Sequence, residues 1–119
     1  MGTPSIKPFV PARDFDVSRR FYRALGFEER WCRNGVAELG LGDCAFLLQD
    51  FYRKDWADNA MIHLLVEDAD ALWQHSETLL EAYPLCRARA PRDEPWGVRQ
   101  CVLRDPCGVL WHIGHSLER

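Results

Sequence analysis

The feature that most constrains this chain is a pattern that occurs twice, 54 positions apart, within 119 residues. The segment Ala12-Arg-Asp-Phe-Asp16 matches the segment Val66-Glu-Asp-Ala-Asp70 in its acidic positions. In each segment the first aspartate suits a helix N-cap, and the second lies where the helix dipole favours an anion. We therefore expect one domain, residues 1–119, built from two copies of one unit, about residues 1–55 and 56–119.

Each unit is predicted to contain one strand, one helix and then three strands. In the first unit, residues 5–10 alternate as a strand that Pro11 closes, and Pro8 within it suits an edge or an end of a strand. The helix carries an apolar stripe at i, i+4 and i+8 and ends at a glycine. That stripe and glycine are Val17, Phe21, Leu25 and Gly26. The three strands are expected at residues 27–33, 36–40 and 44–49, with Asn34-Gly35 as a hairpin turn.

The second unit begins after residues 50–59, which we interpret as a polar and aromatic connection. Residues 60–66 alternate as a strand, with Ile62, Leu64 and Val66 on one face and Met61, His63 and Leu65 on the other. A helix follows and stops at Pro84. Three further strands are expected at residues 87–90, 98–103 and 109–114, with a turn at residues 105–108.

One helix per unit covers one face of a sheet and leaves the other face open. Two such units side by side are able to curve their open faces around a shared cleft. The predicted fold class is therefore α+β: two βαβββ modules that form a cupped mixed β-sheet, with the helices on its outer face.

Composition excludes several classes of function. The net charge of −3 and the scattered basic residues disfavour nucleic acid and anionic membranes as partners. The sequence shows no long apolar run and no signal peptide, so a cytoplasmic location is expected. Its five cysteines are odd in number and widely spaced, which favours reduced thiols over a disulfide framework or a zinc knuckle.

Four short motifs carry a family resemblance that spans roughly the whole chain. They are residues 14–27 (DFDVSRRFYRALGF), 66–72 (VEDADAL), 95–99 (PWGVR) and 105–108 (DPCG). The first and the last are specific in combination. With its two βαβββ units, the chain resembles the vicinal oxygen chelate superfamily, which includes glyoxalase I, extradiol dioxygenases and bleomycin resistance proteins. The bleomycin-resistance-like branch fits best.

The resemblance implies where enzymes of this superfamily hold a divalent metal. One ligand usually precedes the Asp of each helix by seven residues, which here gives Lys7 and Met61. The last ligand follows the Asp of the final turn by seven residues, which gives His112, and Gln49 is a counterpart for the remaining one. An ammonium group has no free lone pair, and a thioether is a poor ligand for Zn, Mg or Mn. We therefore expect no metal and no cofactor.

The histidines leave two interpretations open. His63 lies on the same face as Met61, and together with His112 it would make an improvised metal site. Two imidazoles are fewer protein ligands than a catalytic zinc site normally has, because such sites normally have three. The favoured interpretation is that both histidines hydrogen-bond a polar ligand, water or each other in the cleft.

Two tryptophans and one arginine complete the candidate binding residues. Trp56 and Trp96 lie in segments predicted as loops, where core packing demands less and binding groups are common. Their flat indoles suit stacking on a planar ligand. Arg99 offers a rigid fork of donors for an anion, and the alternative interpretation is an exposed residue or a salt bridge.

The expected function is a metal-free protein that sequesters a small planar or aromatic molecule in an aromatic-lined cleft, similar to bleomycin and other antibiotic resistance proteins. The residues predicted to bind it are Trp56, Met61, His63, Trp96, Arg99 and His112. The alternative is a metal-dependent glyoxalase-like lyase or dioxygenase with a degenerate metal site. The resemblance also implies a homodimer with its clefts at or near the subunit contact.

Overall fold

A computed structural model describes residues 2–84 and 86–118 of the chain. The first module contains β1 (Phe9–Ala12), α1 (Phe15–Leu25), β2 (Glu28–Arg33), β3 (Val36–Leu41) and β4 (Cys44–Asp50). The second contains β5 (Met61–Leu65), α3 (Ala69–Glu81), β6 (Ala88–Asp93), β7 (Val98–Arg104) and β8 (Leu110–Ser116). A short helix, α2 (Lys54–Asn59), connects them. The α+β fold of two βαβββ modules is therefore confirmed.

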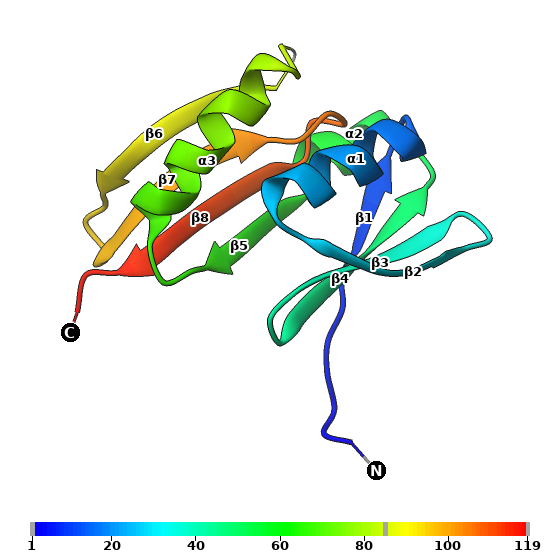
Figure 1. Cartoon of the computed structure of the whole chain (residues 1–119), viewed down its shortest axis with the longest axis horizontal. Helices are drawn as coiled ribbons and strands as arrows, with labels where there is room; N and C mark the ends of the chain where they lie inside the picture. Colours follow the sequence, from blue (N-terminus) through cyan, green and yellow to red (C-terminus); the bar gives the residue numbers. More distant parts are fainter. Residues whose placement is uncertain (1, 85, 119) are drawn as a thin grey trace.

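Both modules follow the same path through their sheets. The strand order is β1-β4-β3-β2 in the first and β5-β8-β7-β6 in the second, and each sheet has one parallel pair, β1 with β4 and β5 with β8. Within the described residues the two four-stranded sheets are hydrogen-bonded separately and lie side by side (Figure 1). The internal repeat in the sequence thus corresponds to a repeat in topology.

Local signals placed the helix starts and the first hairpin correctly. The carboxylates of Asp14 and Asp68 accept the backbone N–H groups of Val17 and Ala71, so both act as N-caps. Asn34 and Gly35 have positive φ angles of 52° and 76°, as the tight turn between β2 and β3 requires.

Three predicted boundaries were wrong. Strand β1 covers Phe9–Ala12, not residues 5–10, and includes Pro11, which an edge strand tolerates because one side of its backbone is unpaired. The connection at 50–59 contains α2, whose six residues are too few for a visible apolar stripe. Strand β6 extends through Asp93, because an irregularity in its pairing accommodates Pro91.

One hydrophobic core joins the two modules. The Trp111 indole of β8 packs edge-on or tilted against the rings of Tyr22, Phe27 and Phe46, at centroid distances of 5.3 to 5.7 Å. Its Nε1–H donates to the Tyr22 hydroxyl, which donates in turn to the buried Asp105 carboxylate. Polar and aromatic contacts therefore tie α1 of the first module to the β7–β8 turn of the second.

Helices α1 and α3 lie on the same side of the sheets and contact each other (Figure 1). We call the opposite side the open face. Side chains alternate along the strands, so residues between buried core positions point to it. Large apolar side chains are exposed there: Phe9 is 51% exposed, Met61 65% and Leu65 61%.

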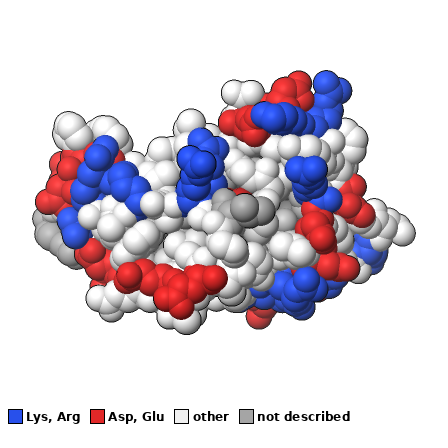
Figure 2. All heavy atoms as spheres, turned by 90° about the horizontal axis from the view of Figure 1, so that it is seen from above, with Lys and Arg blue, Asp and Glu red and all other residues white. Residues whose placement is uncertain are grey.

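Charged residues of both signs are interspersed on the side of the molecule shown in Figure 2. Among the described residues, no helix combines the length and the apolar character that crossing a membrane requires.

Candidate functional site

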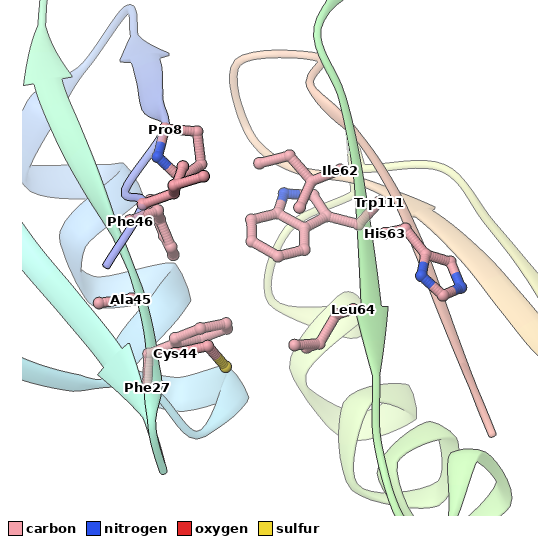
Figure 3. A pocket seen from close by; sticks show the side chains of 10 residues that line it. Pro8, Phe27, Cys44, Ala45, Phe46, Ile62, His63, Leu64 and Trp111 are labelled. Carbon is pink, nitrogen blue, oxygen red and sulfur yellow. The ribbon is translucent and has the colours of Figure 1, made fainter. Parts of the chain in front are cut away.

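A pocket of about 200 Å³ lies between the modules, where β4 faces β5. We call it the seam pocket. Phe46 and Phe27 line it from the first module, and Ile62, Leu64 and Trp111 line it from the second (Figure 3). Ile6, Pro8, Cys44, Ala45 and His63 complete its wall. Because all of these side chains except those of His63 and Cys44 are aliphatic or aromatic, the pocket is predominantly apolar.

Its volume limits what the seam pocket holds. Ligand pockets commonly measure about 300 to 1,000 Å³, so about 200 Å³ accommodates a single ring system rather than a large molecule. The ring of His63 points away from the pocket, across β5 (Figure 3). His63 therefore connects the seam pocket with the open face of the second module.

The structure brings the two predicted histidines together. His63 and His112 are register partners in the parallel pair β5–β8, so both side chains lie on the open face. Met61 lies two residues before His63 on the same face and is paired with Leu110. Burial lowers the pKa of His112 below its ordinary value, and the neighbouring His63 lowers it further.

A polar cluster centred on the buried side chains of Glu94 and Gln100 lies beside His112 and was missed by the sequence analysis. The Glu94 carboxylate accepts from Arg89, Arg92 and the side-chain amide of Gln100, and the same amide nitrogen lies 3.2 Å from His112 Nδ1. We call Arg89, Arg92, Glu94, Gln100 and His112 the Glu94 cluster. The alternation of β7 places Gln100 on the open face, but no sequence signal identifies Glu94, which follows the irregular strand β6.

Arg99 lies on the other face of β7. Its guanidinium binds the Asp70 carboxylate of α3, with a closest distance of 2.9 Å, and the Asp93 carboxylate at 3.1 Å. This is the salt-bridge interpretation of Arg99, and it separates the side chain from the histidines.

Trp56 and Trp96 stand at opposite ends of the second sheet. Trp56 belongs to α2 just before β5, and Met61 of β5 is level with Leu110 at the start of β8. Trp96 is 65% exposed and precedes Val98, which is level with Ser116 at the other end of β8. At about 3.3 Å per residue, these ends lie roughly 20 Å apart. The two indoles do not face each other across one small ring.

The positions that would hold a metal in an enzyme of this fold do not fit one. Lys7 Nζ is 2.8 Å from Glu38 Oε1, so an ammonium and its ion pair occupy the first position. Met61 offers only a thioether, which leaves the His112 imidazole as the one suitable ligand among these three positions. Within residues 2–84 and 86–118 we find no group of three or more His, Cys, Asp or Glu side chains arranged to bind a metal.

Comparisons with known proteins agree with the motifs. The family model described as Glyoxalase/Bleomycin resistance protein/Dioxygenase superfamily matches residues 6–113. A bleomycin resistance determinant encoded on the transposon Tn5 has 26% identity and a TM-score of 0.81, covering 96% of this chain and 98% of that chain. A bleomycin-binding protein complexed with bleomycin has 24% identity and a TM-score of 0.81, covering 96% of this chain and 99% of that chain.

The same fold also occurs in an enzyme. Lactoylglutathione lyase from Agrobacterium tumefaciens has 19% identity and a TM-score of 0.69, covering 96% of this chain and 95% of that chain. At this identity the similarity concerns the fold alone. Comparison with curated proteins gives no match.

Proposed function

The chain belongs to the glyoxalase/bleomycin resistance protein/dioxygenase superfamily, and from this premise we propose that it is a metal-independent binding protein for a small planar or aromatic molecule. The observation that carries the proposal is the ion pair between Lys7 and Glu38. It occupies a position where an enzyme of the superfamily would present a metal ligand. Binding and sequestration need no such ligand.

The proposed ligand uses two kinds of surface. An aromatic ring enters the seam pocket against Phe27, Phe46 and Trp111, and its polar part extends past His63 toward His112. Burial of the ring supplies most of the affinity, and stacking on an aromatic side chain adds roughly 0.5–1.5 kcal/mol. No covalent step is involved, so the protein acts by holding the molecule away from its target.

Met61, Trp56 and Trp96 remain proposed contacts for a ligand larger than the seam pocket. Met61 is exposed on the open face beside His63, where a flexible thioether side chain adapts to ligands of irregular shape. The two tryptophans lie at the ends of the sheet, so each would contact a different part of an extended molecule. Arg99 is the weakest of the predicted contacts, because Asp70 and Asp93 already neutralise it.

Bleomycin is the first molecule to test, because bleomycin-binding and bleomycin resistance proteins share the fold over nearly the whole chain. We expect bleomycin to raise the melting temperature by mass action and to change tryptophan fluorescence through Trp111. Phe46→Ala should weaken binding, whereas Ala88→Ser, on the distant strand β6, should not. Absence of binding at millimolar bleomycin would contradict the proposal for this class of antibiotic.

Metal analysis separates this proposal from the lyase or dioxygenase alternative. Protein purified without chelator should contain no stoichiometric Zn, Mn, Fe or Ni. Close to one metal ion per chain, lost in His112→Ala, would favour the enzyme. The similarity to a lyase supports the fold only, and the donor set around Met61 and Lys7 gives that alternative no further support.

We also propose that the protein is a cytoplasmic homodimer. Phe9, Met61 and Leu65 expose apolar surface on the open face, which monomers rarely leave uncovered over large areas. The five free cysteines suit a reducing compartment. Light scattering at micromolar concentration should give twice the chain mass, and a monomer mass would count against the dimer.

A further inference from the structure

The Glu94 cluster fixes the orientation of one amide. The Glu94 carboxylate is buried and accepts hydrogen bonds from Arg89 at 3.2 Å and from Arg92 at 3.1 Å. Gln100 is also buried, and its Nε2 lies 3.4 Å from Glu94 Oε2. A carboxylate accepts and does not donate, so the NH₂ group of Gln100 must face it and its carbonyl oxygen cannot.

This orientation determines the tautomer of His112. The same Nε2 atom of Gln100 lies 3.2 Å from His112 Nδ1. An NH₂ group has two hydrogens, so it donates one to Glu94 and the other to His112 Nδ1. Nδ1 is therefore the acceptor, and a neutral imidazole must carry its single proton on Nε2.

In the part of the chain that the structure describes, the Nε2–H group of His112 has no acceptor. Nε2 is buried and has no hydrogen-bond partner among residues 2–84 and 86–118, although the His112 side chain as a whole is only partly buried. Leaving a buried donor unpaired is unfavourable, so native proteins pair nearly all such donors with a protein group, an ordered water or a ligand. The ring lies on the open face beside the exposed His63, and because Nε2 is itself buried, a neighbouring side chain must move aside before a ligand contacts it.

We propose that His112 Nε2–H donates a hydrogen bond to an oxygen acceptor of the bound molecule, and that Gln100 and Glu94 are positioning residues for this donor. The inference rests on the proposed binding function and narrows the ligand class. The molecule carries a carbonyl, amide or carboxylate oxygen next to its planar part. A molecule that offers only N–H donors at this point is rejected, because two donors would face each other.

The tautomer is tested without any ligand. Nitrogen-15 NMR of the imidazoles should show His112 protonated at Nε2 in the wild-type protein. Gln100→Leu should shift the population toward the Nδ1–H form, and Gln49→Leu, on the open face of the first module, should not. A wild-type His112 protonated at Nδ1 would overturn the inference, and this measurement decides the tautomer even if Gln100→Leu does not fold.

The donor role is tested with small probes. N,N-dimethylacetamide, an acceptor without donors, should shift the His112 Nε2–H resonance saturably. Tetramethylammonium, of similar size but without an acceptor, should leave it unchanged. Equal shifts with both probes, or none with dimethylacetamide, would overturn the donor role independently of what bleomycin does.

Bleomycin affinity then links the donor to the proposed function. His112→Phe keeps a ring but loses the N–H, and it should weaken bleomycin binding about tenfold, whereas His112→Gln, which keeps an N–H donor, should stay within about threefold. Equal losses in the two variants would overturn the donor role. If wild-type protein does not bind bleomycin at all, the antibiotic proposal fails, and the tautomer and probe measurements still decide this inference.

Discussion

The two modules share one backbone path but present different chemistry on the open face. In the first, Lys7 and Glu38 form an ion pair; in the second, the position 54 residues after Lys7 is Met61, and His63 and His112 lie beside it. Core positions must keep their packing for the fold to persist, whereas open-face positions are free to differ. Topology alone therefore does not locate the binding chemistry, which we propose to lie in the second module.

The modules also differ in how their carboxylates respond to pH. In the first, hydrogen bonds from Arg19 and Lys7 lower the pKa values of Glu29 and Glu38. In the second, burial raises the pKa of Asp105 to about 6. Lowering the pH therefore weakens these interactions in the first module, whereas in the second it neutralises a buried carboxylate.

The largest expected effect comes from the residue that unites the modules. Trp111→Ala should destabilise the protein by about 3–5 kcal/mol, because it leaves a cavity among Tyr22, Phe27 and Phe46. His112→Ala, one residue along the strand on the open face, should have a much smaller effect. Chemical denaturation of both variants measures the difference. Separate unfolding of the two modules in wild-type protein would contradict a shared core.

Asp105 should give the second module a characteristic pH dependence. Its pKa rises from 3.8 to about 6 in the folded protein, so the folded state binds the proton more tightly. The stability that this proton contributes is fully present below about pH 4 and is lost as the pH rises to about 6. The corresponding change in the free energy of unfolding is on the order of 3 kcal/mol. Asp105→Asn should remove this slope.

The matched control for Asp105 is Asp43→Asn in the exposed turn between β3 and β4, which should leave the pH profile unchanged. Thermal unfolding of both variants between pH 4 and pH 7 measures how their stability depends on pH. A wild-type stability that rises over this range, with the same slope in Asp105→Asn, would contradict the assignment.

The ion pair of the first module should act in the opposite direction and more weakly. The pKa of Glu38 is lowered, so its contribution is present above its ordinary pKa of 4.5 and is lost as pH falls through the lowered value. Because Lys7 is partly exposed, Glu38→Gln should cost only about 0.5–1 kcal/mol at pH 7. Lys7→Met, which copies the residue of the second module, should raise the pKa of Glu38, as carboxylate titration by NMR would reveal.

Most of the fold was predictable from the sequence, but only part of the candidate site was. Asp14, Asp68 and Asn34-Gly35 act locally, so their roles were predictable from neighbouring residues. The pairing of His63 with His112 followed from strand alternation and the repeat. Glu94 was not predictable, because its partners converge only when the irregular strand β6 pairs with β7.

The smallest expected effect on stability concerns the two peripheral tryptophans. Trp96 is 65% exposed, so Trp96→Ala should change the free energy of unfolding by less than about 0.5 kcal/mol. Trp56 is half-buried, with its ring centroid 6.0 Å from that of Phe51, so Trp56→Ala should cost more stability than Trp96→Ala.

Because the two indoles lie at opposite ends of the second sheet, a ligand confined to the seam pocket and His112 would lose affinity in neither variant. A ligand that spans the open face would lose up to about tenfold in each, the effect of one stacked ring. Melting temperatures and bleomycin affinities of the two variants therefore measure how far the bound molecule extends beyond the histidines. If both variants unfold, the indoles are core residues and the extent of the binding face has been placed wrongly.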